Sequence, residues 1–413
     1  MGRVAHLWRR FGPFALTASI SIQTMNHVVR AIAAVVAAAS LHTQLDRALH
    51  VPHVPLSSVA ATAVDLAGGE TVYTRNPVLP LQPASNEKLA VTYAALTGLG
   101  PAFRIETDVL GEGEQDGNTW AGDVVLKGYG DPTLSSADLD TLARQVRADS
   151  ITRIAGRVLG DESWFDARRA APGWKAAFLG DDSPPLSALT VDRSTSRQPA
   201  LTAAQLFRKA LVRAGVTVGG SAGLGNADAA AVPLASVDSP TVAAMVHFMD
   251  RVSDNFTAEM LLKELGAVQG SHGTTAAGAG VVTGLLEQAG VPLDGVRIVD
   301  GSGLSLLDRM TSTALVSLLT VMWDDPGVRL ELLSSLPVAG RSGTLSHRLR
   351  GTAAAGIVRA KTGTTDDATA LSGFVGDRFV FSVLVNGHPV SWAWSRAAED
   401  RFAAVLARFE QLH

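Results

Sequence analysis

The chain has 413 residues, a net charge of −4 and no cysteine. This length accommodates two or three compact units, and 46% hydrophobic against 18% charged residues provides a large buried core and excludes a disordered chain. No strongly basic block is present, which argues against nucleic acid as the main partner. The lack of cysteine excludes disulfides, thiolate catalysis and cysteine-ligated metal sites in this chain.

The N-terminal residues 1–39 are typical of an export segment. After Met25 a short basic region ends at Arg30, an apolar stretch AIAAVVAAASL follows, and residues 37–39 are the small residues expected at a cleavage site. The apolar stretch is short for a membrane span, and the alternative interpretation is a buried alanine-rich helix. We therefore expect an exported protein of the periplasm or cell surface, with either Met1 or Met25 as its start and with cleavage or anchoring left open.

The elements expected next are two strands, one helix and then an insertion. Residues 57–76 predict two strands around the Gly68-Gly69 turn. Apolar residues at helical spacing predict a helix from about 85 to 99. From about 105 to 195 short β-like runs rich in glycine and aspartate dominate, which indicates a separate, loop-rich inserted domain.

Helices and then strands complete the chain. Helical patterns cover 201–215, 240–267, 274–290 and 311–323, and an amphipathic helix covers 392–412. Before that last helix come the strand-like runs GIVRAKTGT, TALSGFV and RFVFSVLVNG, and the Gly376-Asp377 turn is expected to join the last two as a hairpin. Strands at both ends with helices between them predict an α+β fold, an antiparallel sheet flanked by helices. The main domain then comprises 40–104 and 196–413, with the β-rich 105–195 block inserted into it.

Ser85 and Lys88 lie three residues apart at the start of the first predicted helix, so their side chains share one face. A serine hydroxyl needs a nearby base to act as a nucleophile, and a lysine provides one when desolvation or positive charge lowers its pKa. The plain alternative is a helix N-cap followed by a solvated lysine. The spacing alone decides little, because six lysines give roughly a 50% chance of one such pair.

Two further motifs occur once each in the chain. Ser253-Asp254-Asn255 is the only Ser-x-Asn segment, and Lys361 opens the only Lys-Thr-Gly segment. The order Ser-x-x-Lys, Ser-x-Asn, Lys-Thr-Gly is that of serine β-lactamases and penicillin-binding proteins. All three motifs occur in this order by chance with a probability on the order of 1% or below.

Each motif has a chemical use next to the Ser85 hydroxyl. Ser253 and Lys88 can share a proton network that relays a proton to a leaving amine. Asn255 can hold a substrate amide and orient Lys88. Lys361 adds positive charge, which attracts a substrate carboxylate and helps keep Lys88 neutral.

The residues after Lys361 suit a bound peptide. Gly363 lets a ligand backbone lie close against the strand, as an added strand would. The N–H groups of Thr364 and Ser85 can form an oxyanion hole. The hydroxyl of Thr362 or Thr364 can bind a terminal carboxylate.

From about residue 57 to 390 the chain resembles the class C low-molecular-mass penicillin-binding proteins, D-alanyl-D-alanine carboxypeptidases and endopeptidases. The segments that carry the resemblance are, in order, PASNEK, GYGDPTL, GDESWFD, PLSALTVD, RVSDNFTAEMLL, DGSGLS, LPVAGRSGTL and VRAKTGT. The resemblance implies a penicillin-sensitive serine DD-peptidase that acts on peptidoglycan stem peptides without cofactor or metal. It implies that β-lactam antibiotics are covalent inhibitors.

The resemblance also implies residue roles. Ser85 attacks the D-Ala–D-Ala carbonyl with Lys88 as its base, D-alanine leaves, and water hydrolyses the acyl-enzyme. In endopeptidase mode the same serine cleaves a D-Ala–diaminopimelate cross-link. By analogy Asp161 lies near the pocket for the free amino end of a diaminopimelate side chain, and its equally supported alternative is a loop-capping aspartate.

Two rival functions stay open. A serine β-lactamase shares all three motifs and differs by fast deacylation, but no dedicated deacylating glutamate is identifiable, and the inserted domain favours the peptidase. A non-catalytic cell-wall-binding protein of the same fold is the second rival. A binding module does not need the complete set of nucleophile, base and supporting amine, which argues against it.

Overall fold

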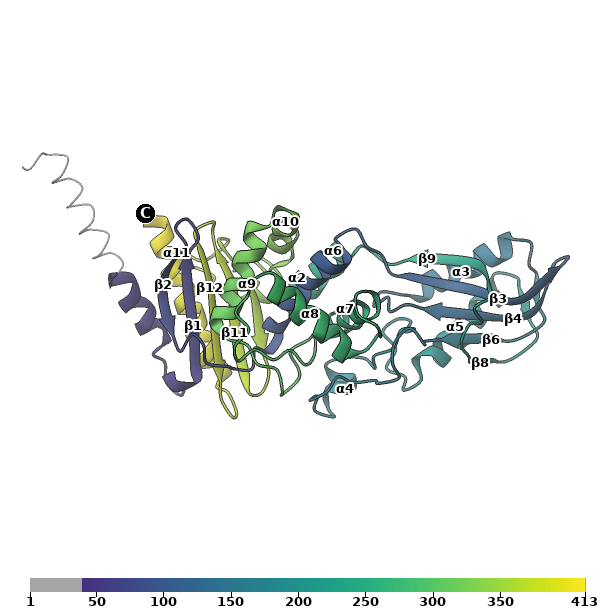
Figure 1. The fold of residues 1–413 in the computed structure, drawn as a ribbon, viewed down its shortest axis with the longest axis horizontal. Helices are drawn as coiled ribbons and strands as arrows, with labels where there is room; N and C mark the ends of the chain where they lie inside the picture. Colours follow the sequence, from purple (N-terminus) through teal and green to yellow (C-terminus); the bar gives the residue numbers. More distant parts are fainter. Residues whose placement is uncertain (1–38, 413) are drawn as a thin grey trace, which may run out of the picture.

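A computed structural model describes residues 39–412 of the chain. The predicted export segment therefore lies outside the described residues, except for its last one. The described part is elongated, with a β-sheet toward each end and a layer of helices between the two sheets (Figure 1). None of the helices between residues 39 and 412 has the length and apolar character needed to cross a membrane.

The main sheet has five antiparallel strands in the order β10-β11-β12-β1-β2. Its strands are β1 (Val59–Asp65), β2 (Glu70–Arg75), β10 (Val358–Thr364), β11 (Ala368–Val375) and β12 (Phe379–Asn386). Both predicted hairpins form, one between β1 and β2 and one between β11 and β12. Because β1 pairs with β12, strands from the two ends of the chain share one sheet, and the predicted α+β fold is confirmed.

Alternate residues of these strands fill two separate cores, as the pleat of a strand requires. Ala60 and Leu384 point toward the central helices. Their neighbours Ala61 and Val383 point to the opposite face. That face is covered by a helix over 39–49 and by α11 (Trp392–Leu412), which confirms the predicted C-terminal helix.

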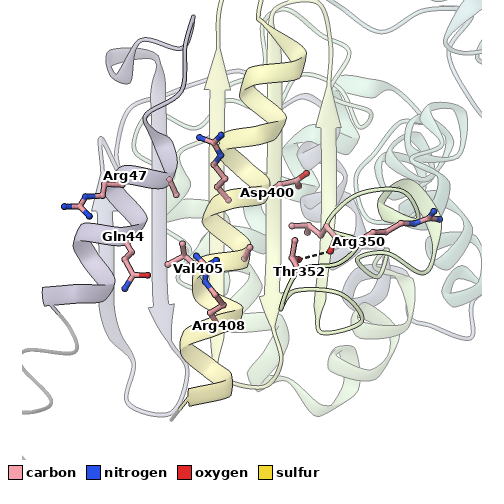
Figure 2. A pocket seen from close by; sticks show the side chains of 11 residues that line it. Gln44, Arg47, Arg350, Thr352, Asp400, Val405 and Arg408 are labelled. Carbon is pink, nitrogen blue, oxygen red and sulfur yellow. Dashed lines mark hydrogen bonds between the residues drawn. The ribbon is translucent and has the colours of Figure 1, made fainter.

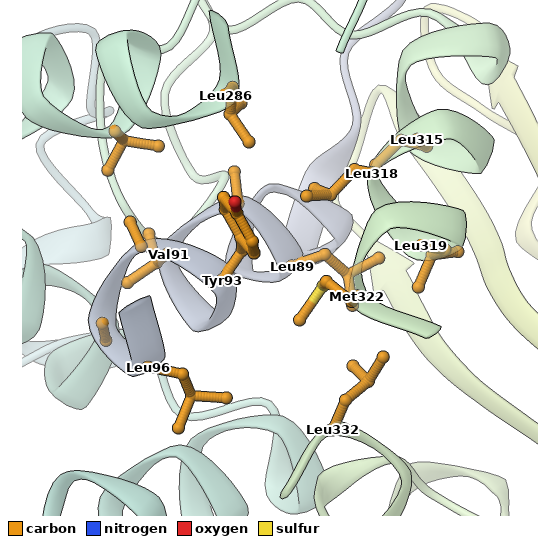
Figure 3. Close-up of a cluster of buried hydrophobic side chains, with 14 of the residues drawn as sticks. Leu89, Val91, Tyr93, Leu96, Leu286, Leu315, Leu318, Leu319, Met322 and Leu332 are labelled. Carbon is orange, nitrogen blue, oxygen red and sulfur yellow. The ribbon is translucent and has the colours of Figure 1, made fainter. Parts of the chain in front are cut away.

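The central helices surround α2, which carries the Ser-x-x-Lys segment at its start. They are α2 (Lys88–Ala94), α6 (Val242–Val252), α7 (Asn255–Val268), α8 (Thr275–Gln288), α9 (Ser312–Asp324) and α10 (Pro326–Ser335). Leu89, Val91 and Leu96 are buried among leucines of α8, α9 and α10 (Figure 3). Each buried leucine contributes roughly 2 kcal/mol, so this core holds the start of α2 in a fixed place.

The helix expected over 85–99 is helical throughout but changes its winding. A 3₁₀ turn, η2 (Ala84–Glu87), precedes α2, and a π-helical turn, η3 (Ala95–Leu99), follows it. Hydrophobic spacing predicts the helical region but does not distinguish these hydrogen-bond patterns.

The second sheet has seven strands. They are β3 (Glu106–Asp116), β4 (Thr119–Gly128), β5 (Arg153–Ile154), β6 (Val158–Asp161), β7 (Thr217–Val218), β8 (Ala222–Leu224) and β9 (Val232–Asp238). Two helices pack on it, α3 (Ser136–Ala148) and α5 (Pro199–Arg213). A loop containing the short α4 (Phe178–Asp181) leads from this region back toward the central helices.

The boundary predicted at residue 195 falls too early. α5 shares a core with α3, and β9 pairs with β3, so both belong to the second sheet. A helical pattern in the sequence does not reveal which sheet a helix covers, so the pattern over 201–215 is compatible with either sheet. Where the chain enters and leaves this unit, the Ser239 N–H donates to the Ile105 carbonyl, and the Ile105 N–H donates to the Ser239 hydroxyl. We therefore propose that the inserted domain spans about residues 105–239.

Candidate active site

Three segments that are far apart in the sequence meet between the main sheet and the central helices. Ser85 lies on η2, Lys88 begins α2, the Ser-x-Asn motif joins α6 to α7, and Lys361 lies on β10. Lys88 Nζ donates to Ser85 Oγ over 3.0 Å and to Asn255 Oδ1 over 2.8 Å. Lys361 Nζ donates to Ser253 Oγ over 2.8 Å. The five predicted catalytic side chains thus form one cluster.

Lys88 is completely buried at the centre of this cluster. Its ammonium makes a third hydrogen bond, to the backbone carbonyl of Ser302 over 2.5 Å. Burial lowers the pKa of Lys88 to about 8, although the carboxylates of Asp300 and Asp254 act in the opposite direction. With this pKa about one molecule in ten carries a neutral amine at pH 7. Lys88 is therefore suited to accept a proton from Ser85.

Lys361 is the second buried amine of the cluster. Burial, together with the neighbouring Lys88 and against the opposite effect of the Asp250 carboxylate, lowers the pKa of Lys361 to about 7. Two amines in one buried groove disfavour each other's charge. A proton on either amine therefore lowers the pKa of the other.

The junction between α6 and α7 aims the second motif into the groove. Ser253 ends α6 in the left-handed conformation, with φ 63° and ψ 44°. The chain then enters α7 directly, and the N-cap residue Asp254 accepts a hydrogen bond from the Thr257 N–H. With only Ser253 and Asp254 between the helices, Ser253 and Asn255 reach different amines of the same cluster.

Arg193 holds this junction from the inserted domain, because its guanidinium donates to both carboxylate oxygens of Asp254, over 2.6 and 2.9 Å. We expect Arg193→Met to destabilise the fold by roughly 1–2 kcal/mol, since the partly exposed pair is bidentate, and to slow active-site acylation. Thermal unfolding and fluorescent penicillin labelling measure the two effects. Arg213→Met, which breaks a more exposed pair with Asp140, is the control and should leave labelling unchanged. Equal labelling of both variants would contradict the expectation.

The turn that carries Ser85 is tightly built. Ala84 has a positive φ of 46°, and a Cβ at Gly303 would lie 1.9 Å from the Ala84 carbonyl, so that position accepts only glycine. The Asn86 side chain donates to the Lys361 carbonyl over 3.1 Å, which ties the turn to β10. Ser85 itself is only half-buried, so its hydroxyl stays accessible to a ligand.

β10 is the edge strand of the main sheet, and its C-terminal half has no strand partner on the outer side among the described residues. The Ala360 N–H donates outward, to the Pro337 carbonyl. Peptide groups of alternate residues face the same side of a strand, so the N–H groups of Thr362 and Thr364 also face the open edge. This orientation is the one that the predicted added strand and oxyanion hole require.

Side chains along β10 divide between its two faces. Lys361 and Gly363 face the cluster, and a Cβ at Gly363 would lie 2.9 Å from the Pro83 carbonyl, so this residue keeps strand and nucleophile turn in contact. The hydroxyl of Thr362 contacts that of Thr344 over 2.7 Å, and the hydroxyl of Thr364 accepts from Arg396 over 3.1 Å. Binding of a terminal carboxylate by these hydroxyls stays a prediction.

Asp161 does not join the cluster. It lies buried on β6, where it accepts hydrogen bonds from the Ser163 and Ala227 N–H groups and pairs with Lys127 over 3.4 Å. These bonds lower its pKa despite burial. Its contacts are those of the loop-capping alternative, and its role in recognising a diaminopimelate side chain stays a prediction that none of these contacts supports.

Sequence reasoning missed several groups at the site. The Ser302 carbonyl binds Lys88, and Glu259 binds the backbone of the same loop. Asp182 of the inserted domain accepts from the Asn255 amide over 3.0 Å through its carbonyl, and Trp174 donates to Asp300. The DGSGLS segment was the available signal for the loop, but backbone carbonyls and buried glutamates have no sequence motif of their own.

A well-formed pocket elsewhere is not this site. It has a volume of about 510 Å³ and lies between the 39–49 helix and α11, on the opposite face of the main sheet (Figure 2). Its polar lining includes Arg47, Thr352 and Arg408. None of the predicted catalytic side chains lines it, so we assign the chemistry to the buried cluster.

The comparisons with known proteins agree with this geometry. A model of the D-Ala-D-Ala carboxypeptidase 3 (S13) family matches residues 41–198 and 193–409. The chain is 31% identical to a D-alanyl-D-alanine carboxypeptidase of Actinomadura sp., with 89% of this chain and 85% of that protein covered. It is 33% identical to carboxypeptidase DacB of Mycolicibacterium smegmatis, with 89% and 83% covered.

A solved structure shows the same fold. The crystal structure of penicillin binding protein 4 (dacB) from Haemophilus influenzae aligns with this protein over 91% of this chain and 99% of the other chain, with a TM-score of 0.78 and 19% identity. A second structure of that protein, in complex with a β-lactam, gives a TM-score of 0.75. With the three motifs gathered in one groove and a family model that matches almost the whole described chain, this protein belongs to the D-Ala-D-Ala carboxypeptidase 3 (S13) family.

Proposed function

We propose that the protein is a serine DD-peptidase that hydrolyses D-Ala-D-Ala termini of peptidoglycan stem peptides outside the cytoplasm and is acylated by β-lactams. The observation that carries the proposal is the position of Lys88 Nζ, within hydrogen-bonding distance of both Ser85 Oγ and Asn255 Oδ1. A lysine buried between a serine hydroxyl and an amide is a general base rather than a surface charge. The names of the carboxypeptidase relatives support the substrate class.

The proposed reaction begins when neutral Lys88 takes the proton of Ser85 Oγ. The oxygen attacks the carbonyl carbon of the penultimate D-alanine, and the N–H groups of Ser85 and Thr364 stabilise the resulting oxyanion. The C–N bond then breaks, and the proton held by Lys88 passes to the leaving amine through the Ser253 hydroxyl. Water attacks the acyl-enzyme by the reverse proton path, which releases the shortened peptide and restores Ser85.

Lys361 has a separate role in this proposal. Its ammonium donates to Ser253 Oγ and to the Thr362 carbonyl over 3.1 Å, at the open edge of β10. A positive charge there attracts the carboxylate of a peptide C-terminus or of a penicillin. We also propose that the same serine cleaves D-Ala–diaminopimelate cross-links.

The experiment that separates the candidate functions uses a fluorescent penicillin and a D-Ala-D-Ala peptide. A long-lived acyl adduct with D-alanine release supports the peptidase. Rapid penicillin turnover without D-alanine release would instead identify a β-lactamase, and no adduct with wild-type protein would identify a non-catalytic wall-binding protein. Defined cross-linked muropeptides then measure the endopeptidase share.

The acylation rate should depend on pH through Lys88. The pKa of Lys88 is lowered to about 8, and only its neutral form accepts a proton. The rate at saturating penicillin should therefore rise about tenfold per pH unit below pH 8 and level off above it. Lys361, with a pKa lowered to about 7, loses its charge over this range, so KM for a carboxylate substrate should rise as kcat rises. A rate constant that is flat between pH 6 and 8 would contradict this assignment of the base.

A further inference from the structure

We propose that Glu259 is a positioning residue for Lys88 and acts through the backbone carbonyl of Ser302. The proposal rests on the proposed function, in which Lys88 is the base. Glu259 Oε1 accepts hydrogen bonds from the Gly301 N–H over 3.0 Å and from the Ser302 N–H over 2.8 Å. The carbonyl of that same Ser302 accepts from Lys88 Nζ over 2.5 Å. One carboxyl oxygen thus fixes the two peptide groups that directly precede the one whose carbonyl binds the base.

The helical register of α7 explains why Glu259 reaches this loop. Asn255 and Glu259 are four residues apart and therefore share one face of the helix. Asn255 contacts Lys88 directly, and Glu259 contacts it through the loop. α7 therefore holds the amine of Lys88 by two routes.

The 300–305 loop is packed so tightly on both sides that a shift of its backbone at one side moves the other side. A Cβ at Gly301 would lie 2.7 Å from the Ala258 carbonyl of α7, and one at Gly303 would lie 1.9 Å from the Ala84 carbonyl next to the nucleophile. The loop is therefore a rigid wedge between α7 and the turn that carries Ser85. A shift of its backbone on the α7 side displaces either the Lys88 acceptor or the nucleophile turn.

Asp300 makes the loop rigid from within. It accepts from the Gly303 N–H over 2.7 Å, the Ser305 N–H over 2.8 Å and the Ser302 hydroxyl over 3.0 Å. Trp174 of the inserted domain donates to it over 2.8 Å. What remains for Glu259 is to place this pre-formed loop against α7, since the Gly301 and Ser302 N–H groups bond to no other acceptor in the described chain.

The role of Glu259 depends on its oxygen as an acceptor rather than on its charge. Glu259 is completely buried, and burial together with the neighbouring Asp300 raises its pKa to about 8. A neutral carboxyl group still accepts two N–H bonds through its carbonyl oxygen. Glutamine offers the same acceptor at the same reach, whereas methionine of similar volume offers none.

This contrast defines the test. Glu259→Gln should acylate with penicillin G within about threefold of wild type, whereas Glu259→Met should be slower by roughly 30-fold at saturation, because misplacing a general base loses much of its contribution. The loss should fall on the acylation rate constant more than on the apparent Kd of the penicillin. It should also shift the pH at which that rate constant levels off, because the Ser302 carbonyl is a ligand of the Lys88 ammonium.

The matched control is Glu264→Met on the same helix. Glu264 is also buried, but its carboxylate accepts from the Trp164 side chain over 2.8 Å and not from the loop. This variant should lose thermal stability without any change in the acylation rate per folded molecule. If it slows acylation as much as Glu259→Met does, or if Glu259→Gln is as slow as Glu259→Met, the proposal is overturned.

Gly301→Ala tests the same link if Glu259→Met does not fold. Its added Cβ pushes the loop away from α7 and leaves the Glu259 side chain intact, so it should also slow acylation, by roughly tenfold or more. A normal rate with Gly301→Ala would overturn the proposal. Failure of wild-type protein to form any adduct would instead count against the proposed peptidase function, so the two failures are distinguishable.

Discussion

Ser85→Ala is expected to abolish penicillin labelling and to lower D-alanine release by roughly 10⁴-fold or more, as loss of a covalent nucleophile does. The structure gives two reasons for this expectation. The hydroxyl is the group that Lys88 Nζ contacts over 3.0 Å, and the residue is half-buried in a groove rather than packed in a core. Removing one partly exposed oxygen should change the melting temperature by no more than about 2 °C. Intact-protein mass spectrometry after incubation with penicillin G measures the adduct.

Ser58→Ala is the control for this substitution. Ser58 is another half-buried serine, at the end of a short 3₁₀ turn before β1, far from the three motifs in the sequence. The Ser58→Ala variant should be labelled by penicillin at the wild-type rate. An adduct that persists in Ser85→Ala would place the nucleophile elsewhere and remove the basis for the proposed mechanism.

Lys88→Met should give the second large loss, with acylation slower by roughly 10³-fold, the range that general-base removal produces. Unlike Ser85→Ala, it should also destabilise the fold, because the Ser302 carbonyl and Asn255 Oδ1 lose a buried donor. Each unsatisfied acceptor costs about 1–3 kcal/mol. Stopped-flow acylation and thermal unfolding measure the two effects separately.

Lys263→Met separates loss of a base from loss of a buried lysine. Lys263 is also completely buried, but its ammonium pairs with Asp166 over 2.5 Å, outside the cluster. This variant should lose stability to a similar extent and keep the wild-type rate of acylation per folded molecule. Similar loss of acylation in both lysine variants would mean that Lys88 supports the fold and not the reaction.

The local parts of the fold were predictable because each has a local cause. The strand-like runs GIVRAKTGT, TALSGFV and RFVFSVLVNG predicted β10 to β12, and the Gly376-Asp377 turn predicted the hairpin between β11 and β12. The end of the inserted domain was not predictable in this way. α5 has the same kind of apolar stripe whether it covers the main sheet or packs on α3, so only the three-dimensional structure assigns it.

The same distinction, between local causes and packing of distant segments, applies to the site. Ser85, Lys88, Ser253, Asn255 and Lys361 were predictable because side-chain chemistry at fixed spacing leaves a motif, and the structure brings them together. The role of the Ser302 carbonyl was not predictable, because every residue has a backbone carbonyl. Glu259 and the Asp182 carbonyl contact the cluster only through folding of distant segments, so no spacing in the sequence indicates them.

The open edge of β10 also bears on whether two copies of the protein pair through their sheets. Exposed edge strands invite sheet extension by neighbouring chains. Here the 337–339 segment pairs with the start of β10, and the ion pair of Lys175 with Asp366 lies just past its end, so only the C-terminal half of the strand lacks a strand partner on its outer side. An unpaired stretch this short is long enough for the end of a peptide, and we expect it to pair poorly with a strand of a second folded protein.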